Sequence, residues 1–369
     1  MGSKSGFPLG EVIQSALPSG HFDEILVPLT ASPKPLHLRI ARKLSAASGL
    51  IPQLESSTLP ANAGSPWATD RHRYAANQAL ALLERYHDSL CLLPAAEDEF
   101  CSDFACAPSD VKCRIFVCFH QPPGWFRLNW RSFDDLKSLG GIVCLGHEQA
   151  AFFRSVCESP VHLLRHGVRH DFFQPPEDIS MRKDNRLLFV GQWLRDFETL
   201  SNAMALVWSR RPDVQLDCVV PRFARNSEPL RRLAMDQRVT WHAELSDEQL
   251  RGLYQAADLL FLPLLDAVAN NAVVEALACG LPIISTHVGG MSENLPSGAG
   301  QLCQLSDALS HAEAICNWLD DPARREVAGV TARNFAQENF DWGAIGSKLV
   351  DFLNKQMLSI KPDSSFARE

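Results

Sequence analysis

The residues with the clearest chemical potential lie in the stretch Asp266–Glu293. Asn270 and Asn271 stand where a helix is expected to begin, and Glu275 follows about one turn later. Because the first N–H groups of a helix have no partner within it, such a start attracts an anion such as a diphosphate. The carboxylate of Glu275 can accept two hydrogen bonds from a diol such as a ribose. The stretch is therefore interpreted as a site for a phosphorylated ligand.

Two further candidate side chains follow segments that have the pattern of buried strands. Arg195 comes shortly after Arg186–Val190, and His120 comes directly after Arg114–Phe119. A guanidinium can neutralise two phosphate oxygens and stabilise a leaving group as negative charge develops. An imidazole can donate or accept a hydrogen bond near neutral pH. Because open parallel sheets bind ligands beyond their carboxyl strand ends, both positions favour a binding role.

Each of these side chains also has a simpler interpretation. Glu275 could be a solvated glutamate on a helix face, Arg195 a surface arginine and His120 a satisfied core or turn histidine. An ionised glutamate is rarely placed in an apolar stretch without a partner. We therefore prefer the functional interpretation for Glu275, and the strand-end positions favour it for Arg195 and His120.

The segments that must position these residues alternate between short apolar strands and helices. In the first half, strands are expected at 24–29, 114–119, 141–145 and 161–164, and helices at 36–48, 70–86 and 148–155. In the second half, strands are expected at 186–190, 214–220, 239–242, 259–262 and 283–285, and helices at 197–210, 222–235 and 247–256. This alternation predicts parallel, doubly wound sheets.

The length and the middle of the chain predict two domains. A chain of 369 residues is too long for one ordinary core. The run 175–178, two prolines followed by two acidic residues, is interpreted as a linker. We therefore expect two Rossmann-like α/β domains facing a cleft, one over residues 1–177 and one over residues 178–342.

Composition and charge are typical of a soluble, cytoplasmic globular protein. Apolar residues make up 46% of the chain and charged residues 21%, and no apolar run has the length of a membrane span. The net charge is −8, whereas a general nucleic-acid binder is usually basic, so no nucleic-acid partner is expected. The basic helix expected at 36–48 is interpreted first as a solvated face and second as a peripheral membrane contact at the inner face of a membrane.

The eleven cysteines fit a reducing compartment because they form no regular framework. Four of them gather in one region of the first half, but their gaps lack the close pairs of a zinc site. These four are Cys101, Cys106, Cys113 and Cys118. We interpret them as reduced core and loop thiols rather than metal ligands, and we predict no metal site.

Five segments together resemble the GT-B-fold retaining glycosyltransferases of family 4 (GT4), or glycosyltransferase group 1. In addition to Asp266–Glu293, they are His166–Val168 with Asp171–Phe173, Leu188–Gly191 with Arg195–Leu200, Leu245–Leu250 with Tyr254, and Phe340–Trp342. They occur in the order that the family has, over residues 115–355. The resemblance implies a GT-B fold in which a C-terminal helix, here 343–360, crosses back to the N-terminal domain.

The resemblance also implies roles for the candidate residues. Glu275 resembles the glutamate that holds the ribose hydroxyls, and Arg195 the basic residue on the donor diphosphate. His120 resembles a histidine that contacts the donor sugar from the N-terminal domain. Further donor-binding positions are Gly191, Gln192, Asn270, Asn271 and Ala272, with Trp241 and His242 near the base.

Several other side chains have two open interpretations. Trp125, Phe126 and Trp130 line an acceptor pocket or pack in the core, and His166 faces the cleft or is structural. The glycines that follow the strand at 283–285 are expected to allow a close backbone approach, with Thr286 on the same turn. These glycines are Gly289 and Gly290.

The chain departs from the family at three places. The family usually carries a second Glu eight residues before Glu275, where this chain has Ala267, and Asp266 is the candidate replacement as a catalytic contact to the donor sugar. An Arg commonly stands at the position of Gln192, so Arg222 or Arg225 is a candidate for the missing charge. The family also opens with a strand and a Gly-rich loop, whereas Met1–Gly10 has glycines without a preceding strand.

The predicted activity is retaining transfer of a hexose, with UDP-glucose as the expected donor, to a hydroxyl of a saccharide or lipid-linked acceptor. No Asp-x-Asp motif occurs, and the resemblance implies no metal and no other cofactor. Two alternatives remain: a sugar-nucleotide epimerase of the same fold, and a non-catalytic subunit that binds sugar nucleotides. The sequence gives neither the acceptor nor the oligomeric state.

Overall fold

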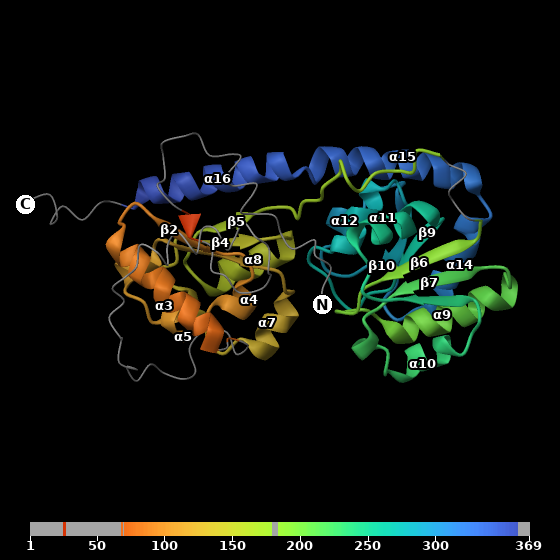
Figure 1. Ribbon diagram of the computed structural model, residues 1–369, viewed down its shortest axis with the longest axis horizontal. Helices are drawn as coiled ribbons and strands as arrows, with labels where there is room; N and C mark the ends of the chain where they lie inside the picture. Colours follow the sequence, from red (N-terminus) through yellow and green to blue (C-terminus); the bar gives the residue numbers. More distant parts are fainter. Residues whose placement is uncertain (1–24, 27–67, 69, 179–183, 361–369) are drawn as a thin grey trace, which may run out of the picture. The chain divides into compact units, whose positions relative to one another are not determined.

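The protein divides into two compact α/β units in its computed structural model, which describes residues 25–26, 68, 70–178 and 184–360. One unit consists of residues 165–346, and the other of the described residues before 165 and after 346. Each unit is built on one parallel sheet, as Figure 1 shows, and this confirms the predicted fold class. The expected helix at 36–48, and with it the membrane contact, lies outside the described residues, as does Met1–Gly10.

The unit of residues 165–346 contains a six-stranded sheet in the order β11-β10-β9-β6-β7-β8. Its strands are β6 Arg186–Val190, β7 Gln215–Val219, β8 Val239–His242, β9 Leu259–Leu262, β10 Ile283–Thr286 and β11 Gly300–Cys303. Its helices are α9 Phe197–Arg210, α10 Glu228–Ala234, α11 Asp247–Ala256, α12 Asn271–Ala278, α13 Met291–Asn294, α14 Ala308–Leu319 and α15 Pro322–Asn339. The strand β6 pairs with β7 on one side and with β9 on the other. The strands that follow β6 in the sequence are therefore added first on one side of it and then on the other.

Helices cover both faces of this sheet, because its central strands are apolar on both sides. The strand β9 is fully buried, and β6 is buried along its middle. Helix α9 contacts both α10 and α14 on one face, while α12 packs against α15 on the other. Figure 1 shows α11 and α12 above the sheet and α9 and α10 below it.

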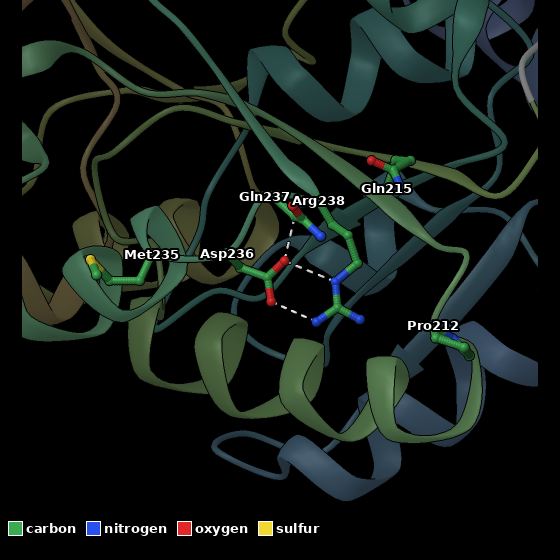
Figure 2. A pocket seen from close by; sticks show the side chains of 6 residues that line it. All are labelled: Pro212, Gln215, Met235, Asp236, Gln237 and Arg238. Atoms are coloured by element: carbon green, nitrogen blue, oxygen red, sulfur yellow. Dashed lines mark hydrogen bonds and ion pairs between the residues drawn. The ribbon is translucent and has the colours of Figure 1, made fainter.

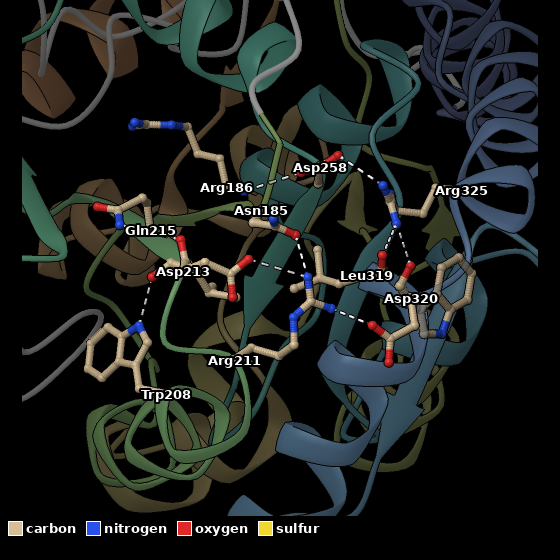
Figure 3. A network of polar contacts seen from close by, with 12 residues as sticks. Asn185, Arg186, Trp208, Arg211, Asp213, Gln215, Asp258, Leu319, Asp320 and Arg325 are labelled. Atoms are coloured by element: carbon tan, nitrogen blue, oxygen red, sulfur yellow. Dashed lines mark hydrogen bonds and ion pairs between the residues drawn. The ribbon is translucent and has the colours of Figure 1, made fainter.

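A network of polar contacts ties together the segments at the amino edge of this sheet. Arg211 donates to Asn185 at 2.7 Å and pairs with Asp320, which follows α14. Arg325 of α15 lies 3.4 Å from Asp258, whose carboxylate accepts the backbone N–H of Arg186. Figure 3 shows these contacts converging on the starts of the strands. These contacts involve the amino edge of the sheet, whereas the loops that carry the candidate residues follow the carboxyl ends of its strands.

The other unit contains a five-stranded sheet in the order β1-β2-β3-β4-β5. Its strands are β1 Ile25–Leu26, β2 Leu90–Leu93, β3 Ile115–Phe119, β4 Gly141–Cys144 and β5 Val161–Leu163. Its helical segments are α3 Asp70–Arg85, α4 Ala96–Glu99, α5 Ser102–Ala105, α6 Ser109–Lys112, α7 Pro123–Asn129, η1 Phe133–Leu136 and α8 His147–Val156. The helix α16 Trp342–Ser359 starts in the first unit and belongs to this one from Ser347 onward. Its Phe352 ring packs on Phe116 of β3, with 6.0 Å between ring centroids.

Several elements differ from the sequence prediction, and two of them show the reason. The helix expected at 222–235 is interrupted: a 3-10 turn, η3 Arg222–Ala224, precedes α10, which has Pro229 in its first turn. Proline lacks an N–H and fits only at a helix start, so it sets the beginning of α10. The strand β2 was not predicted, because a run of four buried residues is too short to distinguish the periodicity of a strand from that of a helix.

The predicted linker at 175–178 is attached to the unit of residues 165–346. Gln255 of α11 donates to the carbonyls of Gln174 at 2.8 Å and Pro175 at 3.4 Å, and Arg333 of α15 donates to the nearby carbonyl of Phe173 at 2.9 Å. The chain passes between the units at Leu164–Arg165, earlier than the predicted boundary at 177, and again at Gly346–Ser347.

Candidate active site

The loop after β6 folds the side chain of Arg195 back over the end of that strand. The Nε atom of Arg195 donates to the carbonyl of Val190, and Nη1 donates to the carbonyl of Trp193, each at 2.9 Å. Gly191 makes this possible because its φ is 95° and a Cβ there would lie 2.7 Å from Nη2 of Arg195. The strand end therefore holds a guanidinium in a fixed place.

Arg195 also reaches the start of α12, which the sequence analysis singled out. Its Nη2 atom lies 3.3 Å from Oδ1 of Asn270, and the same oxygen accepts the backbone N–H of Ala272 at 3.1 Å. Asn270 is thus the N-cap of α12. The fold brings a cation and a helix N-terminus together at the carboxyl edge of one sheet. Both features attract a phosphate.

The charge of Arg195 persists in this setting. Burial lowers the pKa of its guanidinium to about 10, which leaves the group protonated at neutral pH. A cation that is half-removed from water interacts more strongly with an anion than one on an exposed surface. Arg195 can therefore bind a diphosphate and respond to charge that develops on it.

Glu275 lies on the buried face of α12. It is 3% exposed, and its Oε2 accepts a hydrogen bond from the hydroxyl of Tyr254 in α11 at 2.9 Å. Burial and the Glu275 carboxylate together raise the pKa of Tyr254 well above its ordinary value, so the hydroxyl remains a donor. This geometry is incompatible with a solvated helix-face glutamate. Its predicted contact with a ribose remains a prediction.

The loop between β9 and α12 is held by close backbone contacts. A Cβ at Gly289 would lie 2.0 Å from the carbonyl oxygen of Ala267, and one at Gly290 would lie 2.2 Å from that of Val268. The Oδ1 atom of Asp266 accepts the N–H of Ala267 at 2.8 Å. Asn271 is the first residue of α12 and is half-buried. The two glycines are therefore required by backbone proximity, as expected.

The side chain of Thr286 supports the start of this loop by hydrogen bonding. Its hydroxyl oxygen accepts the N–H of Leu264 at 2.9 Å and lies 3.3 Å from Nε2 of His311. The Nδ1 atom of His311 lies 2.7 Å from the carbonyl of Asp307, and burial lowers the pKa of His311. The imidazole is thus a neutral support within the core.

The end of β8 brings Trp241 and His242 into different surroundings. The Nε2 atom of His242 lies 2.7 Å from Oδ1 of Asp217, a buried carboxylate that also pairs with Arg186. The ring of Trp241 lies under the guanidinium of Arg225, at 5.0 Å from its centroid. The imidazole of His242 is therefore held by Asp217 within the sheet, and the guanidinium of Arg225 lies over one face of the Trp241 ring.

Neither arginine named as a substitute for the charge missing at Gln192 stands beside Arg195 in the described contacts. Arg225 donates to the carbonyls of Val220 at 2.7 Å and His242 at 2.6 Å. Arg222 is 77% exposed on its side chain and lies 4.0 Å from Glu244. Arg195 is the cation that contacts the N-cap of α12, whereas Arg333 contacts the last residue of that helix.

His120 lies in the other unit, at the end of β3. Its Nδ1 atom and its backbone N–H both contact Oε1 of Glu97, at 3.2 Å and 3.1 Å. Burial opposes the charged ring, but Glu97, Glu99 and Asp98 together outweigh it, and the pKa of His120 is raised. Sequence reasoning missed Glu97, although its position shortly after the short apolar run of β2 is a signal that could have found it.

The aromatic residues near His120 are mostly core residues. Phe126 is fully buried and Trp130 is 6% exposed, and their rings pack on Phe119 with centroids 5.0 Å and 5.5 Å apart. Trp125 is half-buried. His166 belongs to the unit of residues 165–346 and contacts the carbonyl of Gly167 at 2.9 Å. Core packing is thus the interpretation that the structure supports for Phe126 and Trp130.

The predicted thiol cluster is divided between core and surface. Cys101 and Cys118 are buried, Cys113 is half-buried and Cys106 is exposed, and all four are free thiols. In the part of the chain that the structure describes, no group of three or more His, Cys, Asp or Glu side chains is arranged to hold a metal ion. Within the same residues, no helix combines the length and the apolar character that crossing a membrane requires.

A hollow of about 800 Å³ in the same unit lies away from these residues. It is formed at the starts of β7 and β8, and its lining includes Gln215, Asp236 and Arg238. The carboxylate of Asp236 and the guanidinium of Arg238 pair with each other in this lining, as Figure 2 shows, and the structure gives 2.6 Å between Oδ2 and Nη2. Because it opens at the amino edge of the sheet, it is not part of the candidate site.

Gly191→Ala is expected to destabilise the protein by about 1–3 kcal/mol, since alanine at a positive φ is strained and its Cβ displaces Arg195. The matched control is Gly252→Ala in the middle of α11, where a Cβ meets nothing within 4 Å. That change should stabilise the helix by about 0.5–1 kcal/mol. Urea unfolding of both variants measures the difference, and equal effects would contradict the role of Gly191.

Comparison with known proteins gives three findings. Residues 184–321 match the family model described as glycosyl transferases group 1. A GDP-mannose-dependent phosphatidylinositol monomannoside mannosyltransferase of Corynebacterium glutamicum is 31% identical over 43% of this chain and 44% of its own length. A D-inositol 3-phosphate glycosyltransferase of Pseudarthrobacter chlorophenolicus is 33% identical over 48% of this chain and 46% of its own. The chain thus spans about half the length of these curated relatives.

Solved structures resemble the chain over a larger share. Sucrose-phosphate synthase from Thermosynechococcus elongatus superposes with a TM-score of 0.64 at 20% identity, over 91% of this chain and 99% of that one. The Anabaena protein HepE in complex with UDP-glucose gives a TM-score of 0.61 at 16% identity, over 76% and 82%. Residues 184–321 therefore match the glycosyl transferases of group 1, and the chain has the fold of the GT-B glycosyltransferases.

Proposed function

We propose that the protein is a retaining glycosyltransferase that moves a hexose from a nucleoside diphosphate sugar to a hydroxyl of a saccharide or lipid-linked acceptor. The observation that carries this proposal is the contact between Arg195 and Asn270 at the start of α12. It places a fixed cation beside a helix N-terminus, at the sheet edge where α/β folds bind ligands. The family match over this segment supports the same assignment.

In the proposed reaction, the bond between the anomeric carbon and the diphosphate breaks as the acceptor oxygen attacks. The acceptor proton passes to the departing phosphate oxygen, so the step needs no protein nucleophile. Arg195 meets the charge that grows on the diphosphate, and the N-terminus of α12 adds its dipole. Glu275, held by Tyr254, would accept the ribose hydroxyls, while Asp266 would contact the sugar hydroxyls.

The nucleotide and the sugar are finer parts of the proposal. UDP-glucose is our first candidate donor, and the name of the HepE complex supports it. GDP-mannose is the second candidate, because a relative with 31% identity is named as a GDP-mannose-dependent mannosyltransferase. Trp241 offers a ring for the base of either nucleotide.

Transfer assays with UDP-glucose, GDP-mannose and other nucleotide sugars test the function. Released UDP or GDP is measured against a panel of saccharide, inositol phosphate and lipid-linked acceptors. We expect one donor to be consumed only when its acceptor is present, with retained configuration in the product. Epimerised free nucleotide sugar would identify the epimerase instead, and binding without turnover over the whole panel would favour a non-catalytic subunit.

We further expect the same turnover after dialysis against EDTA as before it. In this proposal Arg195 and the start of α12 supply the positive charge that a metal ion would otherwise supply. The comparison uses one enzyme preparation with and without EDTA, followed by added Mg²⁺ or Mn²⁺. Loss of more than about tenfold in kcat, restored by the metal, would contradict metal-independent transfer.

A further inference from the structure

A carboxylate that no sequence pattern singled out holds His120 from two directions. Glu97 Oε1 lies 3.2 Å from Nδ1 of His120 and accepts the backbone N–H of the same residue at 3.1 Å. The side chain of Glu97 is 6% exposed, whereas that of His120 is 28% exposed. One oxygen thus orients both the ring and the backbone of a residue that solutes can reach.

The fold explains why these two residues meet. The neighbouring parallel strands β2 and β3 end at Leu93 and Phe119. Residues that follow them therefore gather at the same carboxyl edge, where parallel sheets bind ligands. Helix α4 begins directly after β2 and presents Glu97 in its first turn. The pairing depends on a contact between residues 23 positions apart along the chain.

A second buried side chain fixes the backbone on both sides of His120. The amide nitrogen Nε2 of Gln149 in α8 donates to the carbonyls of Phe119 at 3.1 Å and Gln121 at 2.7 Å. Its Oε1 atom accepts the N–H of Leu145 at 2.8 Å, and Gln149 is 1% exposed. His120 is therefore held at its ring by one element and at its flanking carbonyls by another.

The charges around the ring come mainly from α4. Burial works against the protonated imidazole, but Glu97, Glu99 and Asp98 favour it, and the pKa of His120 is raised as a result. On α3, His72 acts on Asp98, as His120 itself does. The ring therefore keeps its proton to a higher pH than an ordinary histidine and can donate a hydrogen bond.

We propose that Glu97 is the positioning residue of His120, holding Nδ1 so that the imidazole is fixed at the carboxyl edge of the sheet in its own unit, where it acts on a bound substrate. This proposal rests on the proposed function, which supplies the substrate on which His120 would act. The interaction between Glu97 and His120 is open to a test of its own, which does not require a known donor.

The test is an NMR titration of the His120 imidazole in the full chain, assigned with His120→Gln. In Glu97→Gln, the His120 ring stays as buried as before but loses the carboxylate that contributes most to stabilising its positive charge. The proton affinity of His120 should therefore fall by about tenfold or more. The matched control is Glu99→Gln, which removes an equally buried carboxylate whose bond is to the N–H of Ala95, and it should give a smaller fall.

Transfer kinetics supply the readout that a purely structural role would not give. With the donor found active, Glu97→Gln should lower kcat by about 10- to 100-fold with little change in the donor KM. The double variant Glu97→Gln/His120→Gln should lose no more than His120→Gln alone, since Glu97 acts through the ring. Losses that add, or a wild-type titration in Glu97→Gln, would overturn the proposal.

The titration and the kinetics distinguish failure of the proposed function from failure of the role of Glu97. If no donor is transferred by the wild-type chain, the function proposal fails while the titration still decides whether Glu97 controls the ring. If Glu97→Gln does not fold, Glu97→Asp takes its place in the titration. The shorter carboxylate should give an intermediate fall in proton affinity, and an unchanged affinity would again overturn the proposal.

Discussion

Glu275→Ala is expected to weaken binding of the donor nucleotide by about 100-fold or more. The proposed contact is a carboxylate that accepts ribose hydroxyls, and each hydrogen bond to a charged group contributes about 1.5–3 kcal/mol. Glu275→Gln keeps the size of the side chain and removes its charge, so it separates lost hydrogen bonding from lost packing. Titration calorimetry with UDP, GDP and their sugars measures the change.

The control for this prediction is Tyr254→Phe, which removes the hydroxyl that donates to Glu275. It leaves a buried carboxylate with one donor fewer, so we expect a loss of about 1–3 kcal/mol in folding free energy. Donor affinity should fall less than in Glu275→Ala, because the carboxylate itself remains. Wild-type affinity in a folded Glu275→Gln protein would remove Glu275 from the site.

Arg195→Ala should lower kcat by about 10²- to 10³-fold and change donor affinity much less. Its guanidinium interacts most strongly when charge develops on the leaving diphosphate, so its loss acts mainly on the transition state. Single-turnover transfer, together with donor Kd from calorimetry, separates the two effects. Arg195→Lys should recover only part of the rate, because an ammonium lacks the planar fork.

Arg210→Ala is the matched control for Arg195→Ala. It removes an arginine at the far end of α9, where the side chain is 46% exposed and lies 3.8 Å from Glu313. An exposed pair of this kind contributes about 0–1 kcal/mol to stability, and no change in transfer is expected. Equal losses in both variants, or an unchanged kcat in Arg195→Ala, would take Arg195 out of the mechanism.

Local signals in the sequence were sufficient to predict the region around α12. Asn270 before an apolar helical run, and the Gly-Leu-Pro break after it, are signals that act within a few residues. The structure has α12 over Asn271–Ala278, with Asn270 as its cap. Alternation of strands and helices likewise predicted two parallel sheets, because each period is read within a short window.

Partners that are distant in sequence could not be predicted in the same way. The hydroxyl of Tyr254 reaches Glu275 over 21 positions, and Glu97 reaches His120 over 23. Such contacts follow from the order of the strands in a sheet, which a single sequence does not give. The break in the helix expected at 222–235, by contrast, has a local signal. Pro229 in the sequence already indicates that a helix starts there.

The most direct test of the central claim is hydrogen–deuterium exchange of the whole chain with and without saturating UDP-glucose or GDP-mannose. The claim is that a nucleoside diphosphate sugar binds where Arg195 meets the start of α12. Protection should concentrate in peptides that cover 191–196 and 266–276, for the nucleotide sugar that binds. Binding that protects other segments and leaves these two unchanged would contradict the account.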